Sequence, residues 1–311
     1  MRFPTALTLL ALAAPAASGP GTGPTLAVRV PGGWHTWWWG DAAPARWPTP
    51  LPAVADRVRW RRAASGLEWG ELSLSGNGEA FRVRAIVVRL DTRALDLRLV
   101  KPPDGPRFAG RWDIDEAPAK AVLALNAGQF IDQPWGWLVQ DGVERQRPGR
   151  GPLAPAVVLD TAGRMRLVPP DSIDAARPST RLAFQSYPTL LEGDGEVPRA
   201  LFHEGLGVDL AHRDARLALG ELRDGRILIA MTRFEGLGGA LANLPLGLTT
   251  PEMAAVMGAL GARRAVLLDG GVSSQLLIRE GTRTRRWPGW RRVPLGLVAV
   301  PRSPTNGSAT P

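Results

Sequence analysis

Short apolar stretches that alternate with polar residues recur from about residue 65 onward, and turns that contain glycine separate them. Residues 81–90 read FRVRAIVVRL, and residues 95–100 read LDLRLV. A period of two is typical of half-buried strands. Asp-Gly pairs at Asp141 and Asp224 join further alternating stretches, as they do in β-hairpins. The pattern predicts an α+β protein that is rich in β-structure, with a mixed or antiparallel sheet and a few helices.

One helix is well indicated after Thr249. Thr249 and Glu252 have the spacing of a capping box, and Gly261 follows the last apolar residue that keeps helical spacing. A buried strand is predicted next, over residues 265–268. A second helix, short and limited by a proline, is predicted around residues 113–120.

The N-terminus has the pattern of an export signal over residues 1–18. Arg2 supplies a positive charge, an apolar run covers residues 7–14, and small residues surround a cleavage site near Ala17 or Ser18. An uncleaved apolar segment is the alternative. No other stretch is apolar and long enough to cross a membrane. We therefore expect a soluble mature protein outside the cytoplasm, either periplasmic or secreted.

Tryptophan and proline are concentrated before the β-rich region. Seven of the twelve tryptophans lie at or before Trp69, and prolines interrupt them. Such prolines exclude a long helix or a central strand. We interpret residues 19–64 as an extended segment whose indoles pack on a main domain over residues 65–302, with a sugar-stacking platform as the alternative. Residues 303–311 have the composition of a disordered tail.

The composition excludes several kinds of chemistry. The chain has no cysteine, which excludes disulfides, thiolate metal sites and cysteine nucleophiles. Its three histidines show no metal-binding motif. The net charge of +9 is carried almost wholly by arginine and implies affinity for polyanions. The basic residues are spread along the chain, so nucleic acid is not an expected partner.

The strongest candidate site is the sequence LLDGGVSSQL around Asp269. A carboxylate stands where an apolar strand ends. Gly270 and Gly271 then allow a tight turn and close approach of the backbone to a ligand. The hydroxyls of Ser273 and Ser274 follow. The alternative is that Asp269 only forms a turn, because Asp-Gly is a common turn dipeptide.

Other strand ends carry polar residues with the same pattern. Asn126 ends a buried stretch and precedes Gly128, and it either holds a ligand hydroxyl or caps the turn. Gln185 ends a second apolar stretch. Arg216 opens a third, where it either clamps an anion with two hydrogen bonds or forms a structural salt bridge.

Together these motifs resemble the phosphodiester glycosidase family, whose animal member removes N-acetylglucosamine from mannose 6-phosphate diesters. The resemblance covers about residues 65–300, and the Asp269 motif is its most specific part. Four positions depart from the family pattern. Ala127 and Val272 stand where the family usually has glycine, Gln129 where it usually has phenylalanine, and Leu217 where it usually has threonine.

The resemblance implies a secreted hydrolase that cleaves a sugar C1–O–phosphate bond in envelope or extracellular polysaccharide. A phosphate leaving group has a second pKa of about 6, so it needs little protonation to depart. Asp269 would be the catalytic carboxylate, Arg216 the phosphate clamp, and Asn126 a third catalytic residue. Substrate-binding roles are expected for Gln185, Gly128, Gly270, Gly271, Ser273 and Ser274.

Several points stay open in the sequence. A second carboxylate is not evident, and the candidates are Asp132, Glu192 and Asp209. No cofactor is certain, and binding of Ca²⁺ or Mg²⁺ by Asp269 is an alternative. The basic and aromatic run over residues 283–292 either attracts an anionic glycopolymer or forms a solvated hairpin.

Two other functions compete with the hydrolase. One is a non-catalytic binding module for anionic glycopolymers that uses the same pocket. The other is a structural protein that binds polyanions through charge alone. The expected partner is a sugar-phosphate diester or an anionic glycan.

Overall fold

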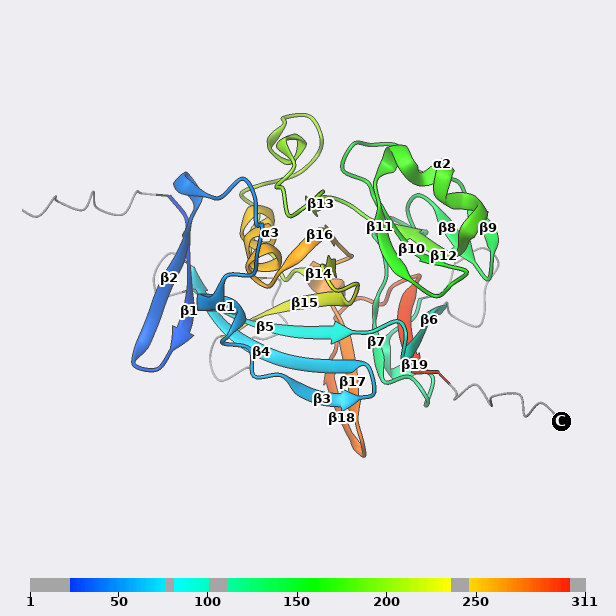
Figure 1. Cartoon of the computed structure of the whole chain (residues 1–311), viewed down its shortest axis with the longest axis horizontal. Helices are drawn as coiled ribbons and strands as arrows, with labels where there is room; N and C mark the ends of the chain where they lie inside the picture. The colour runs from blue at the N-terminus through cyan, green and yellow to red at the C-terminus, as the bar shows by residue number, and fades with distance from the viewer. Residues whose placement is uncertain (1–22, 77–80, 101–110, 236–245, 303–311) are drawn as a thin grey trace, which may run out of the picture.

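The computed structural model describes residues 23–76, 81–100, 111–235 and 246–302 (Figure 1). The described strands form three sheets, and every pairing between them is antiparallel. The predicted α+β class, rich in antiparallel strands, is confirmed. The predicted signal peptide and C-terminal tail lie outside the described residues.

The largest sheet has nine strands and extends from the centre of the molecule to its N-terminal edge (Figure 1). Its order is β13-β16-β14-β15-β5-β4-β1-β2, and β3 also pairs with β4. The strands are β1 (Thr25–Val30), β2 (Gly33–Trp39), β3 (Arg61–Ala64), β4 (Leu67–Gly76), β5 (Phe81–Leu90), β13 (Thr189–Leu191), β14 (Leu217–Leu222), β15 (Ile227–Phe234) and β16 (Ala262–Leu267).

Two five-stranded sheets complete the fold (Figure 1). The second sheet has the order β11-β10-β12-β8-β9, with β8 (Leu138–Gln140), β9 (Val143–Gln146), β10 (Ala156–Asp160), β11 (Met165–Val168) and β12 (Thr180–Gln185). The third sheet has the order β18-β17-β7-β19-β6, with β6 (Leu95–Val100), β7 (Leu123–Asn126), β17 (Leu276–Glu280), β18 (Arg283–Trp287) and β19 (Gly296–Pro301).

Helices are few and short. They are α1 (Pro52–Ala55), α2 (Ile173–Ala176) and α3 (Thr250–Ala259). The short helix predicted around residues 113–120 is a 3-10 helix that covers only Ile114–Glu116. Pro118 disfavours a helical backbone at the preceding Ala117, which is extended. None of the helices in the described ranges is long and apolar enough to cross a membrane.

The alternating pattern divides the largest sheet between two cores. On β15, Ile227, Ile229 and Met231 face a core shared with the two smaller sheets. Leu228 and Ala230 point the other way, into a second core beneath α3. Burial of both faces explains why β15 is almost continuously apolar.

The tryptophans before residue 65 belong mainly to the second core. Trp37, Trp38 and Trp47 are buried there, and the Trp47 ring packs directly on Gly258 of α3. A β-carbon at Gly258 would lie 2.2 Å from that ring. Since β1 and β3 both pair with β4, the structure has no break at residue 65.

The N-terminus of α3 is tied to the loop that precedes β14. Thr249 and Glu252 form the predicted capping box. The Glu252 carboxylate is fully buried and also accepts hydrogen bonds from both terminal nitrogens of Arg213, each at 2.7 Å. This bidentate pair fixes the loop that carries the residues just before β14.

We expect Glu252→Gln to lower the free energy of unfolding by about 2–4 kcal/mol, because it leaves the Arg213 guanidinium without its buried carboxylate. Urea denaturation measures the change. Glu68→Gln is the matched control, because the side chains of the Glu68–Arg226 pair at 3.3 Å are 41% and 31% exposed and solvent-accessible pairs contribute less than about 1 kcal/mol. Equal losses in the two variants would contradict the argument.

Candidate active site

The candidate site lies where the largest sheet meets the third sheet. Asn126 ends β7, Asp269 follows β16, and Arg216 precedes β14. Backbone bonds join the three segments: the Asp269 N–H donates to the Ala127 carbonyl at 3.3 Å, and the Gly271 N–H donates to the Ala215 carbonyl at 2.6 Å. Residues distant in the sequence are thus brought to one place.

Asn126 is fully buried and organises the loop that carries Asp269. Its Nδ2 donates to the Asp269 carbonyl at 2.9 Å, to the Asp269 carboxylate at 3.2 Å and to the Ser273 carbonyl at 2.8 Å. Its Oδ1 accepts from the Gln275 N–H at 3.1 Å. Asn126 therefore holds both ends of the 269–275 loop and contacts the carboxylate itself.

The two glycines after Asp269 are required by close contacts. Gly271 has a φ of +59°, and a β-carbon there would lie 2.6 Å from Oδ2 of Asp214. A β-carbon at Gly270 would lie 2.8 Å from the Ala215 carbonyl oxygen. The tight turn places the Asp269 loop directly against the segment before β14.

The serines are buried beneath this turn. Ser273 lies in a 3-10 turn over Gly271–Ser273 and its side chain bonds to the Asp269 carboxylate. The Ser274 carbonyl accepts a 2.7 Å hydrogen bond from Nη2 of Arg233. Burial lowers the pKa of Arg233 to about 10. The hydroxyl of Ser274 is buried and makes no hydrogen bond within the described part of the chain.

The Asp269 carboxyl has a pKa well above that of an exposed aspartate. Burial raises the pKa of Asp269 to about 6. Hydrogen bonds from Ser273 and Asn126 and the charge of Arg291 act to lower this pKa, while the charge of Asp214 adds to the rise. The group thus titrates near neutral pH, as general bases and nucleophiles of active sites do.

Asp214 is the second carboxylate at the site. Burial raises the pKa of Asp214 although Arg216 and His212 act to lower it. His212 Nε2 lies 3.6 Å from Asp214 Oδ2. The sequence pattern did not single out Asp214, and the signal that was present is an acidic residue two positions before Arg216 at a strand start.

Of the three carboxylates considered from the sequence, Asp209 is near the site, because its charge acts on Arg216, and it accepts from the backbone N–H groups of Ala211 and His212. Asp132 is exposed, and Glu192 lies beside Glu196. Within the described ranges, no group of three His, Asp or Glu side chains forms a cluster that would hold a metal ion.

The Arg216 side chain is partly buried, and two of its three guanidinium nitrogens donate to backbone carbonyls. Nε donates to the Leu248 carbonyl at 2.9 Å, and Nη2 donates to the His212 carbonyl at 2.6 Å. Burial lowers the pKa of Arg216 despite the nearby charge of Asp214. No described residue accepts from Nη1, which leaves N–H groups for an anion.

Gln185 and Gly128 shape the wall beside the site. The Gln185 side chain is buried, and its Oε1 accepts from the N–H groups of Trp137 and Gly149, both at 2.6 Å. Its Nε2 donates to the Ala154 carbonyl at 2.8 Å. A β-carbon at Gly128 would lie 2.0 Å from the Gln185 carbonyl oxygen. Contact of Gln185 with substrate stays a prediction, since its amide bonds in this structure are to the backbone.

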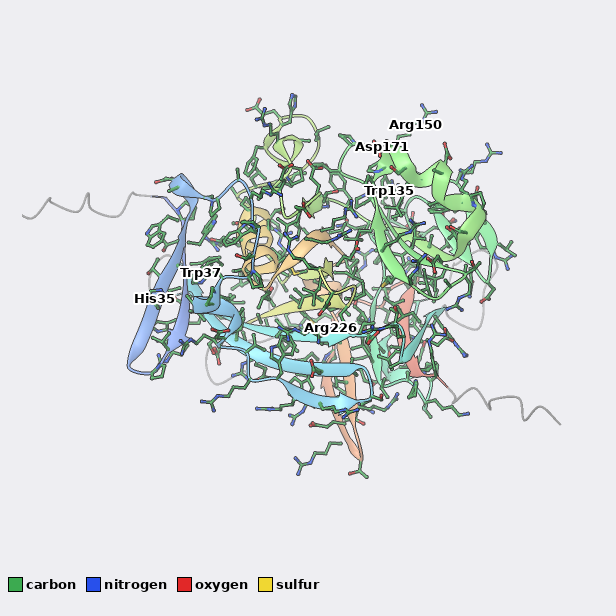
Figure 2. All side chains as sticks on the ribbon, in the orientation of Figure 1. His35, Trp37, Trp135, Arg150, Asp171 and Arg226 are labelled. Atoms are coloured by element: carbon green, nitrogen blue, oxygen red, sulfur yellow. The ribbon has the colours of Figure 1, made fainter. Side chains whose placement is uncertain are left out.

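An aromatic pocket of about 420 Å³ opens beside these residues. Gln129 and Tyr187, which follow the ends of β7 and β12, line it and are joined by a 2.6 Å hydrogen bond from Gln129 Nε2 to the Tyr187 carbonyl. Figure 2 shows two other lining residues, Trp135 and Arg150, close together near the second sheet. The sequence pattern did not indicate this pocket.

Part of the basic and aromatic run reaches the site. The N–H groups of Trp290 and Arg291 both donate to the Val272 carbonyl, and the Arg291 guanidinium lies 4.7 Å from the Phe130 ring. Trp290 is 60% exposed and Val272 is 37% exposed, so both form the rim. The rest of the run contains Arg285, Arg286 and Arg292, which pair with acidic residues.

The family model for phosphodiester glycosidases matches residues 119–300, which is more than half of the chain. The chain belongs to the phosphodiester glycosidase family. The predicted resemblance is confirmed, and membership indicates a hydrolase that acts as a glycosidase on phosphodiester bonds. The matched range contains Asn126, Asp214, Arg216 and Asp269.

Solved structures show the same fold. The catalytic domain of zebrafish N-acetylglucosamine-1-phosphodiester alpha-N-acetylglucosaminidase, auto-inhibited by its pro-peptide, superposes with a TM-score of 0.59 at 15% identity. That match covers 84% of this chain and 96% of the zebrafish chain. A hypothetical protein from Synechocystis gives 0.53 at 17% identity, covering 80% of this chain and 65% of its own. No curated protein matches the sequence.

The raised pKa of Asp269 has a consequence for stability. The carboxyl binds its proton more tightly in the folded chain, where its pKa is about 6, than in the unfolded chain, where it is about 3.9. Ionised Asp269 therefore opposes folding above pH 6, and the effect disappears below about pH 4.

We expect Asp269→Asn to raise the free energy of unfolding at pH 7.5 by about 1–3 kcal/mol, with the gain shrinking toward zero by about pH 4. Denaturant melts at several pH values measure it. Asp132→Asn, on an exposed loop, serves as the control and should change stability by less than about 0.5 kcal/mol. A loss of stability at pH 7.5 would show that burial does not oppose ionisation of Asp269.

Proposed function

We propose that this phosphodiester glycosidase is exported and cleaves the C1–O bond of a sugar 1-phosphodiester in envelope or extracellular glycans. The observation that carries the proposal is one constellation. The charge of Asp214 acts on both Asp269, whose pKa is near 6, and Arg216, and these residues lie beside an aromatic pocket.

Arg216 suits the phosphate side of the scissile bond. A phosphodiester bears a negative charge that increases on the leaving oxygen as the C1–O bond breaks. The unengaged Nη1 of Arg216 can donate to those oxygens, while Nε and Nη2 hold the side chain on backbone carbonyls. Because a phosphate monoester leaves without full protonation, charge neutralisation matters more here than a general acid.

Asp269 suits the sugar side of the bond. Above pH 6 the carboxylate is ionised, so it can stabilise an oxocarbenium-like centre, attack C1, or remove a proton from water. Asn126 and Ser273 hold it in position. Burial, with a smaller contribution from the charge of Asp214, keeps the pKa of Asp269 high, which preserves its basicity near neutral pH.

The aromatic pocket suits a sugar ring. Its volume of about 420 Å³ exceeds that of one monosaccharide, and Trp135 and Tyr187 offer apolar surfaces with polar edges. Gln129 and Arg150 add hydrogen-bond donors. The residues that line this pocket would recognise the sugar or the group beyond the phosphate.

Hydrolysis is tested by release of free sugar from a panel of hexose and N-acetylhexosamine 1-phosphodiesters, with and without EDTA. We expect Asp269→Asn to lower kcat/KM at least about 1,000-fold and Arg216→Gln about 100-fold. Asp132→Asn is the matched control, with a change below about threefold. Tight binding of diesters without turnover would instead support a non-catalytic binding module, and an effect of EDTA would support a Ca²⁺ or Mg²⁺ requirement.

The pH profile tests the role of Asp269 separately. We expect kcat/KM to rise with pH through an apparent pKa near 6, because the ionised carboxylate is the active form. Asp214→Asn removes a negative charge and should move this apparent pKa downward. A profile that falls as pH rises through 6 would show that Asp269 acts as a protonated acid.

A further inference from the structure

A second cavity, far from Asp269, is lined by arginine. It has a volume of about 790 Å³ and lies where β6 and the end of β19 meet β12 and the turn between β10 and β11. Four arginines and one acidic residue are among its lining side chains, namely Arg93, Arg98, Arg181, Arg302 and Asp96. The four cations come from three separate parts of the chain, so only the folded protein assembles them.

The carboxylates near the cavity do not neutralise these cations. Asp96 is shared, since it accepts from Arg181 Nη2 at 2.7 Å and from Arg98 Nε at 2.9 Å. Asp91 pairs with Arg93 at 2.8 Å. Among the described residues, the only hydrogen bond of the Arg302 side chain is to an oxygen without formal charge, the Thr92 carbonyl at 3.0 Å. Two carboxylates therefore serve four guanidinium groups.

The same contacts leave donors for a ligand. Arg98 and Arg302 are each held through Nε, and no described residue accepts from their terminal nitrogens. A guanidinium fixed at Nε offers its two terminal nitrogens as a planar fork. Such forks match the geometry of phosphate oxygens, and a bound anion would also relieve the repulsion among the cations.

We propose that this cavity is a binding site for phosphate groups, separate from the active site. In the β19 register, Gly296 pairs with Asn126 at one end and Pro301 pairs with Leu95 at the other. Five residue steps along a strand span roughly 17 Å. One small diester cannot occupy both sites, whereas a polymer that carries several phosphates can.

The test measures binding of tripolyphosphate and of inorganic phosphate by isothermal titration calorimetry at constant ionic strength. We expect the double variant Arg98→Gln/Arg302→Gln to bind tripolyphosphate at least about tenfold more weakly than wild type. The matched control is Arg57→Gln/Arg59→Gln, which removes the same charge from exposed side chains that have no hydrogen bond or ion pair to described residues. Its affinity should stay within about twofold of wild type.

Equal weakening of the two double variants would overturn the proposal, because net charge alone would then explain binding. Absence of binding to wild type would also overturn it.

Should the first double variant fail to fold, Arg93→Gln replaces it, because the Arg93 side chain is 79% exposed and bonds only to Asp91. Loss of the Arg93 charge should weaken binding about threefold. Equal affinity for both probes would identify free phosphate as the ligand source, and preference for tripolyphosphate would identify a polymer. Binding is read directly, so failure of hydrolysis leaves this test valid.

Discussion

The hydrogen bonds of the Asn126 carboxamide are the interaction on which the site depends. Asp269 lies at the end of a strand of the largest sheet, whereas Asn126 ends a strand of the third sheet. One buried side chain with donors and an acceptor joins the two, and it does so at both ends of the 269–275 loop. The position of a carboxylate at the junction of two sheets depends on how firmly the contacts between those sheets hold them together.

The same junction explains why Asp269 is basic. Close packing of the 269–275 loop against the segment before β14 places two carboxylates in one poorly solvated region. Their mutual repulsion and burial oppose folding, while Arg216, Asn126 and Ser273 limit the cost. The protein thereby sacrifices some stability for a group that exchanges protons near neutral pH, as active sites commonly do.

The sequence was informative where local patterns decide the structure. Alternation predicted the strands, and the residues at strand ends brought Asn126, Arg216 and Asp269 together, because antiparallel neighbours place such ends at shared edges. Asp214 and the aromatic pocket were not predicted, since their roles depend on which loops meet in space. The buried amide of Gln185 shows the same limit. A polar residue at a strand end gives the same sequence pattern whether its side chain binds substrate or the protein backbone.

Arginine has two separate uses in this fold, and the net charge does not distinguish them. Arg233 and Arg279 each donate to several backbone carbonyls, most of them outside the regular strands. A planar group with five N–H donors can satisfy such carbonyls, whereas a lysine ammonium offers three at a single point. Much of the positive charge is therefore structural. Affinity for anions is better inferred from guanidinium groups that keep unengaged donors and line one cavity, as Arg98 and Arg302 do.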